Sequence, residues 1–346
     1  MPRTADTPNP AQMLEAARLF YVEDEAKQDI AERLRIDSRK VTALLKQARE
    51  TGVVKITLSG IAAESELEQK LRTRYPHLQR VMIVPGPRIT AKKYPELLRQ
   101  FAVVGANYFD ELVQNHPRGR ELHIGITGGE TLLEFAGAVP DRLRDNVFIH
   151  ATSFVGHGKF GNSGTNVIPG VNAAVLWSRC GRILGNYEYA TVPPPPFDLD
   201  QMAGIPAIRE VLDDMRLIDV AFASMGMVKP PKSAPKLRGK LSMTQLLHQM
   251  VSTDELVHQG VVADFANCLV DKNGNGRPEW RYFLTAGYGT EYSDVEFYRR
   301  MVEQKKKVVV IGGPFKIPAL MAGLRGKLFS IFITDQHSAA AILKES

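Results

Sequence analysis

The sequence is poor in cysteine and contains no long apolar segment. Only Cys180 and Cys268 occur among its 346 residues, too few for a disulfide framework or a structural zinc cluster, and typical of a reducing compartment. No apolar run approaches the roughly 18 residues that span a bilayer. The first residues contain no apolar core of a secretory signal. We therefore expect a cytoplasmic protein that makes no use of a membrane.

Motifs of common catalytic and metal sites are missing as well. The sequence contains no Gly-x-Ser-x-Gly, no His-Glu-x-x-His and no spacing that pairs a cysteine with a histidine. Residues 271–276 begin like a calcium-binding loop, but Tyr282 stands at the twelfth position in place of glutamate. We predict a hairpin turn there, and we expect neither a metal ion nor a cofactor.

Composition and length indicate an ordinary globular chain of two domains. Hydrophobic residues make up 44% and charged residues 24%, which excludes general disorder and collagen-like repeats. A length of 346 residues suits two domains. The formal net charge of +6 favours polyanionic partners slightly, but many enzymes share such a charge.

Apolar periodicity divides the chain into four parts. Residues 1–10 have no apolar period and are predicted to be a disordered arm. Residues 11–58 predict three short helices and a final strand at 53–58, and residues 59–79 predict a connecting helix that could join a subunit contact. In residues 80–346, β-rich runs alternate with helical stretches, which predicts an α/β domain with a parallel sheet between helices.

The elements expected in this α/β part are short strands and amphipathic helices. The predicted strands are Val81–Val84, Leu122–Thr127, Val147–Val155, Ile218–Ser224, Val261–Leu269, Val308–Ile311 and Leu328–Thr334. The predicted helices are Pro95–Asn115, Glu130–Ala138, Ile205–Met215, Glu291–Gln304 and Pro314–Leu324. The glycine-rich loop 156–165 is long enough to be a lid or only a loop tip.

The segment Lys27–Lys46 has the spacing of a helix-turn-helix. Ala31 stands where two helices would cross, Ile36 follows five residues later in the turn, and Val41 and Leu44 complete a small core. Helices that cross near a right angle need a small side chain at the contact and branched apolar side chains around it. The spacing therefore favours a DNA-binding motif, with an ordinary helical hairpin as the alternative.

The third predicted helix carries a basic face opposite its apolar face. At 100° per residue, the apolar side chains point one way and the polar ones the other. Arginine suits guanine, a methyl group suits thymine and lysine suits phosphate. Residues 26–60 contain eight Lys/Arg against four Asp/Glu, the positive excess that nonspecific DNA binding requires. The predicted DNA contacts are Ser38, Arg39, Lys40, Thr42, Ala43 and Lys46.

Two features flank this helix. Arg35 occupies the turn position where glycine is common, and a positive φ there would cost arginine up to about 1 kcal/mol. Asp37 or Ser38 can cap the helix and leave its first amides near a phosphate.

A glycine turn follows the strand predicted at 122–127. The chain runs through Thr127, Gly128 and Gly129 into a helix that opens near Glu130. Glycines let backbone amides approach an anion, and the helix N-terminus adds a positive dipole. The turn could hold a phosphate with the help of hydroxyl groups, or it could be a plain tight turn.

A second glycine turn and a lone carboxylate complete the candidates. Gly312 and Gly313 precede a helix predicted to start at Pro314, which puts Lys316 in a first turn where a cation opposes the helix dipole. A bound anion would explain this lysine, and a solvated surface position would explain it equally. Asp264 lies in an apolar strand and needs partners, either sugar hydroxyls or structural donors.

In its order of segments the chain resembles the SorC family of bacterial transcriptional regulators. The resemblance runs from about residue 11 to residue 343 and is strongest in the first motif, residues 16–56. The segments 126–132, 261–274 and 308–335 are similar to the family's phosphate loop, to its later acidic strand and to its C-terminal motif. The chain departs from the family at Arg35, Thr127 and Ser224–Gly226. The implied effector-binding residues are Thr127, Gly128, Gly129, Glu130, Thr131, Asp264, Gly313 and Lys316.

The resemblance implies a Rossmann-like effector domain similar to sugar-phosphate isomerases and deaminases, used as a sensor in dimers or tetramers. We predict a DNA-binding regulator of a carbohydrate operon, not an enzyme, that binds operator DNA and a phosphorylated sugar. The alternative is a sugar-phosphate isomerase or deaminase with Asp264 or Glu130 as base. A nucleotide-binding module is a third option, but no phosphate loop of known spacing supports it.

Overall fold

The computed structural model of the chain forms two compact units, residues 1–63 and 64–346. It describes residues 10–51, 53–54, 65–86, 89–140, 148–153, 156–157, 176, 187–188, 191–192, 198–235, 251–281 and 284–345. Residues 1–9 of the predicted arm, the end of the predicted strand 53–58 and most of the loop 156–165 lie outside these residues, whereas Pro10, also predicted in the arm, begins a helix. Among the helices it describes, none is long and apolar enough to cross a membrane.

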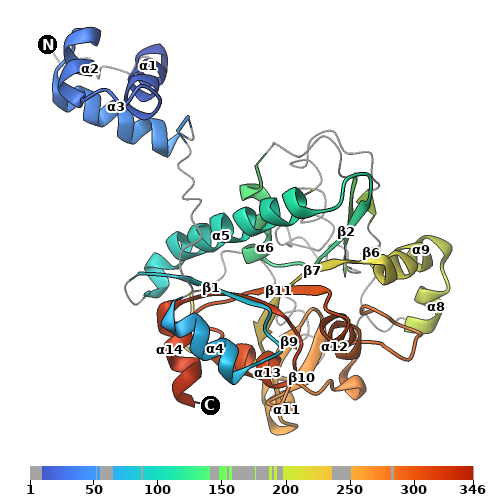
Figure 1. Cartoon of the computed structure of the whole chain (residues 1–346). Coiled ribbons are helices and arrows are strands. Elements are labelled where there is room, and N and C mark those ends of the chain that lie inside the picture. The colour runs from blue at the N-terminus through green and yellow to red at the C-terminus, as the bar shows by residue number, and fades with distance from the viewer. Residues whose placement is uncertain are drawn as a thin grey trace, which may run out of the picture. The chain divides into compact units, whose positions relative to one another are not determined.

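In its described residues the first unit forms three helices (Figure 1), and their buried side chains make one small core. They are α1 (Pro10–Tyr21), α2 (Lys27–Leu34) and α3 (Ser38–Glu50). The predicted core forms, because Ala31, Val41 and Leu44 are buried in one cluster and Ile36 packs against it. Its buried members are Met13, Ala16, Ala17, Leu19, Ile30, Ala31, Val41, Leu44, Leu45 and Ala48.

The strand predicted at 53–58 does not begin where the sequence suggested. Val53 and Val54 form a bend. The Val54 amide donates a hydrogen bond to the Ala48 carbonyl at 2.9 Å, and the Val54 side chain packs against the helical core. The chain therefore turns back onto the end of α3 at this point, which is incompatible with an extended start.

The turn between α2 and α3 contains the backbone strain expected at Arg35. This residue ends α2 with φ 52° and ψ 46°, a left-handed conformation that costs a residue with a Cβ about 1 kcal/mol or more. The Ile36 amide closes the turn on the Ala31 carbonyl at 2.9 Å.

Replacement of Arg35 by glycine is expected to stabilise the first unit by up to about 1 kcal/mol, because glycine adopts this conformation without strain. Hydrogen exchange of the buried Val41 and Leu44 amides in the full chain measures the change. Glu32→Gly, in the regular part of α2, is the matched control and should destabilise by about 1 kcal/mol. Equal destabilisation by both variants would contradict the strain at Arg35.

The second unit is built on a parallel sheet of seven described strands in the order β1-β12-β11-β7-β2-β3-β5. Every strand pair in this sheet is parallel, as predicted. The strands are β1 (Arg80–Val84), β2 (Glu121–Ile126), β3 (Phe148–Ser153), β5 (Tyr187–Glu188), β7 (Val220–Ala223), β11 (Lys307–Ile311) and β12 (Ile331–Asp335). A short parallel pair joins β4 (Gly156–His157) and β6 (Thr191–Val192).

Helices cover both faces of this sheet (Figure 1). Alternate residues of β11 enter different cores: Val309 and Ile311 pack with α5 and α6, whereas Val308 and Val310 pack on the opposite side. A sheet buried on both faces requires continuous apolar strands, and this explains the unbroken apolar run at 308–311.

Six of the nine helices described in this unit correspond to predicted ones, and those at 199–203, 253–258 and 336–345 were not predicted. The nine helices are α4 (Glu66–Arg74), α5 (Tyr94–Asn115), α6 (Glu130–Ala138), α8 (Leu199–Ala203), α9 (Pro206–Asp214), α11 (Thr253–His258), α12 (Val295–Glu303), α13 (Ile317–Arg325) and α14 (Gln336–Glu345). Short 3-10 turns lie at Ala91–Lys93, Met215–Leu217 and Pro278–Trp280. The predicted connecting helix corresponds to α4, which belongs to the second compact unit.

Two predicted strands and two helix starts need correction. The strand predicted at 328–334 begins three residues later, at Ile331. Residues 261–269 form two antiparallel strands, β9 (Val261–Phe265) and β10 (Cys268–Asp271), because Ala266 and Asn267 have positive φ and turn the chain back. Together with β8 (Met225–Met227) they make a second sheet in the order β10-β9-β8.

Of the two helices, α12 begins four residues later than predicted and α13 three residues later. Proline stands at the second position of α13, where its missing amide is tolerated. The hairpin turn predicted at 271–276 is present, because the Asp271 carboxylate accepts the Asn273 and Asn275 amides and Val270 bridges to Gly276.

The strand order reverses between β2 and β7. From β2 the chain continues outward to β3, whereas from β7 it proceeds in the opposite direction to β11 and β12. In open parallel sheets, ligands bind beyond the carboxyl ends of the strands at such a reversal. Both predicted glycine turns follow strands at this edge, one after β2 and one after β11.

Candidate functional site

The exposed face of α3 presents nearly all the residues predicted to contact DNA. Ser38, Arg39, Thr42, Ala43 and Lys46 are exposed, and Lys40 is half-buried. Asp37 caps the helix by accepting the Arg39 amide at 2.7 Å, and so the first turn is fixed without using the side chain of Ser38.

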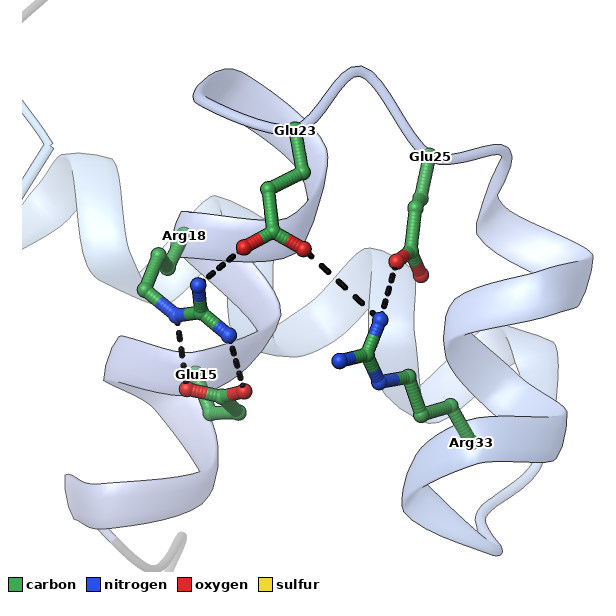
Figure 2. A network of polar contacts seen from close by, with 5 residues as sticks. All are labelled: Glu15, Arg18, Glu23, Glu25 and Arg33. Carbon is green, nitrogen blue, oxygen red and sulfur yellow. Dashed lines mark hydrogen bonds and ion pairs between the residues drawn. The ribbon is translucent and has the colours of Figure 1, made fainter.

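Charge in the first unit is separated along the chain. Residues 10–34 contain six Asp/Glu and three Lys/Arg, whereas residues 35–49 contain five Lys/Arg and one Asp. Figure 2 shows how two of the first three cations are used: Arg18 pairs with Glu15 and Glu23, and Arg33 pairs with Glu23 and Glu25. The basic excess therefore belongs to the turn and to α3.

The turn after β2 is tied to the neighbouring strand β7. Thr127 is 1% exposed; its amide donates to the Phe222 carbonyl at 3.0 Å, and its hydroxyl accepts the Ser224 amide at 2.8 Å. The hydroxyl predicted as an effector donor thus bridges the two strands at the reversal. Gly129 has φ 111°, a conformation that favours glycine, and it directs the chain into α6 next to Ser224.

The first turn of α6 contacts an aromatic residue that the sequence patterns did not reveal. Thr131 makes a side-chain hydrogen bond to Tyr94, the first residue of α5. Burial, with the nearby Glu130 and Asp335 carboxylates, raises the pKa of Tyr94 to about 12, although the Thr131 hydrogen bond opposes this. The Tyr94 ring also packs edge-on against Phe315, with 5.3 Å between ring centroids.

The turn after β11 places Lys316 directly before α13. Lys316 is half-buried at the N-cap, and its amide donates to the Gly313 carbonyl at 3.0 Å. Burial lowers the pKa of Lys316, and the Asp264 and Glu130 carboxylates counteract that effect. A side chain at Gly313 would be crowded, because a Cβ would lie 3.1 Å from Phe101 and 3.4 Å from an Asp335 oxygen.

Asp264 approaches the same place from the second sheet. It is 6% exposed, and one of its oxygens accepts the Asn267 amide at 2.8 Å. Burial raises the pKa of Asp264 to about 6, although the Asn267 hydrogen bond and the charge of Lys316 oppose the rise. The carboxylate is thus both a structural acceptor and a neighbour of the lysine.

These residues form one cluster at the strand reversal. Lys316 interacts electrostatically with Asp264 and with Glu130. In the described residues no group of three or more His, Cys, Asp or Glu could hold a metal ion. The cluster offers one cation, two carboxylates and the N-terminal amides of two helices, a set that suits a ligand with an anionic group and several hydroxyl groups.

The chain matches known proteins over most of its length. Residues 59–344 match the family model described as "Putative sugar-binding domain". The chain is 23% identical to the deoxyribonucleoside regulator of Bacillus subtilis (strain 168) over 339 residues, which is 96% of this chain and 97% of that protein. It is also 23% identical over 343 residues to the transcriptional regulator LsrR of Enterobacter sp. (strain 638), covering 94% and 90% of the two chains.

A solved structure shares the fold over almost the whole length. The full-length sorbitol operon regulator SorC from Klebsiella pneumoniae superposes with a TM-score of 0.67 at 18% identity, covering 98% of this chain and 100% of that one. The chain belongs to the SorC family of sugar-responsive transcriptional regulators, which carry this sugar-binding domain. The predicted family and fold class are confirmed. These relatives are regulators and not enzymes, which argues against the isomerase or deaminase alternative.

Proposed function

We propose that the protein binds operator DNA through α3 and responds to a phosphorylated sugar held at the strand reversal. The observation that supports the effector most directly is the cluster of Lys316 with Asp264 and Glu130 beside two helix N-termini. The amides of Gly128, Gly129 and Thr131 would meet the phosphate together with Lys316. Asp264 and Glu130 would accept sugar hydroxyls.

In this proposal Thr127 and Gly313 shape the site and make no contact with the effector themselves. Thr127 holds the turn against β7, and glycine at position 313 avoids crowding against Phe101 and Asp335. The regulator would work in the cytoplasm, where operator DNA is accessible, as a dimer or tetramer. A symmetric dimer needs a pseudo-palindromic operator with half-sites about 34 Å apart, or multiples of that distance.

Thermal unfolding with a panel of free and phosphorylated sugars tests the effector class. We expect only phosphorylated members to stabilise the protein, and one present at about 100 times its dissociation constant should add about 2.7 kcal/mol. Stabilisation by free sugars alone would contradict the phosphate assignment. Sustained product formation from any panel member would favour an enzyme instead.

Arg39→Ala is expected to weaken operator binding mainly at one base position. A guanidinium that reads guanine discriminates against other bases by roughly 1–3 kcal/mol, and Arg39 is exposed on the outer face of α3. Binding to a set of single-base operator variants measures the effect. Arg33→Ala is the matched control, because Arg33 pairs with Glu23 and Glu25 and lies on α2. An equal loss on every sequence would mean that Arg39 contacts phosphate only.

A further inference from the structure

The carboxylate of Glu68 joins the first turn of α4 to the edge of the main sheet. Its Oε2 accepts the Ser65 amide at 2.6 Å, and the Ser65 hydroxyl accepts the Glu68 amide at 3.3 Å, so the two residues form a capping box. Its Oε1 accepts the Ile83 amide of β1 at 2.9 Å. Each oxygen therefore holds an amide from a different segment.

The Ile83 amide can bond to Glu68 because β1 is an edge strand. Among the described strands, β1 pairs with β12 alone, and alternate amides of an edge strand point away from the sheet. Glu68 accepts one of them. This contact fixes the start of α4, while Leu71, which is fully buried, packs the middle of the helix into the same cluster as Ile342 of α14.

Ile83 lies next to the edge of the sheet where we propose that the effector binds. The following residue, Val84, is in register with Asp335 of β12. Both line a cavity of about 80 Å³ together with Lys93 and Glu96. Asp335 is also the residue that a side chain at position 313 would approach to within 3.4 Å. Ile83 and Val84, two consecutive residues of β1, thus connect the Glu68 carboxylate to the surroundings of the proposed effector site.

Ser65, the other residue bonded to Glu68, precedes α4 on the side of the chain that leads to the proposed DNA-binding unit. Ser65 is the second residue of the second compact unit, which begins at Glu64. A displacement of Val84 or Asp335 by a ligand would move the Ile83 amide, and the Glu68 carboxylate would either follow or lose that bond. In the first case the Ser65 end of α4 moves with the strand, and in the second it loses its bond to the sheet.

We propose that Glu68 is a positioning residue that couples the effector site to the segment leading to the DNA-binding unit. This inference rests on the proposed function. It requires a carboxylate, because glutamine has one acceptor oxygen and cannot accept both amides. Glu68→Gln therefore breaks one of the two bonds while the size of the side chain is kept.

The experiment compares operator binding of the full chain with and without each of three probes: ribose 5-phosphate, fructose 6-phosphate and glucosamine 6-phosphate. The operator is obtained by selection from random DNA. For a probe that changes operator affinity of the unaltered protein, we expect Glu68→Gln to reduce that change at least fivefold. Operator affinity without probe and the affinity for the probe should each change less than twofold. Exchange of the Ile83 amide should accelerate at least tenfold.

Glu66→Gln is the matched control. Glu66 lies in the same turn and pairs with Lys70, and both side chains are exposed. This variant should keep the full response and the slow exchange at Ile83. A full response in Glu68→Gln, or an equal loss in Glu66→Gln, would overturn the inference while the proposed function stands. If no probe changes operator binding of the unaltered protein, the proposed effector class and the inference fail together.

Discussion

Lys316→Met is expected to weaken binding of a phosphorylated sugar by about 100-fold and to leave operator affinity without effector unchanged. A charge-assisted hydrogen bond contributes roughly 1.5–3 kcal/mol, and a factor of 100 corresponds to about 2.8 kcal/mol. Without this cation, the Glu130 and Asp264 carboxylates would repel a phosphate. Calorimetric titration with the sugar phosphate identified by thermal unfolding measures the loss.

Methionine is unbranched like lysine and replaces most of its aliphatic stem without the charge, so the variant should fold. Lys272→Met serves as the control, because Lys272 is exposed in the hairpin turn and should bind the effector normally. Unchanged affinity in Lys316→Met would show that the anion is held elsewhere, and the role of the turn after β11 would have to be abandoned.

Asp264→Asn is expected to raise the free energy of unfolding by up to roughly 3 kcal/mol at pH 8, while it weakens effector binding. The pKa of Asp264 is raised from 3.8 to about 6 by burial, so folding favours the protonated form. The penalty of the ionised carboxylate is absent below pH 4, grows between pH 4 and pH 6 and is constant above. A shift of about two units corresponds to roughly 3 kcal/mol.

Denaturant unfolding at pH 4.5 and pH 8 measures this gain. Asparagine retains an oxygen for the Asn267 amide, so the hydrogen bond survives. Asp271→Asn is the control of opposite sign: burial raises the pKa of Asp271, but hydrogen bonds from Asn275 and Asn273 outweigh it and lower the pKa. Asp271→Asn should therefore lose stability at pH 8. A stability gain that is equal at both pH values would contradict the buried charge at Asp264.

The local elements followed from the sequence because their signals are local. Apolar spacing of three and four residues identified α3 and its buried Val41 and Leu44. β-rich runs identified β11 and, apart from its start, β12. Strand–helix alternation then predicted a parallel sheet. The failures were local as well. The break in the predicted strand depends on positive φ at Ala266 and Asn267, and the sequence gives no indication that alanine adopts this conformation.

The contacts of the candidate site were only partly predictable. Gly129 and Lys316 carried signals in their turns, and they do stand at strand ends near the reversal. Tyr94 carried none, since it is 37 residues before Thr131 in the sequence and meets it only because α5 packs on α6. The same holds for Glu68 and Ile83, whose contact depends on how α4 lies on β1.

The separation of charge in the first unit has a consequence for how it would meet nucleic acid. Residues 10–51 contain eight Lys/Arg and eight Asp/Glu. This part of the unit therefore has a charge dipole but no net charge. Near a polyanion, such a body experiences a torque that turns α3 inward and the acidic helices outward, but little net attraction at long range. Its encounters with random DNA would be brief and already correctly oriented, and lasting residence would depend on base pairs that α3 can read.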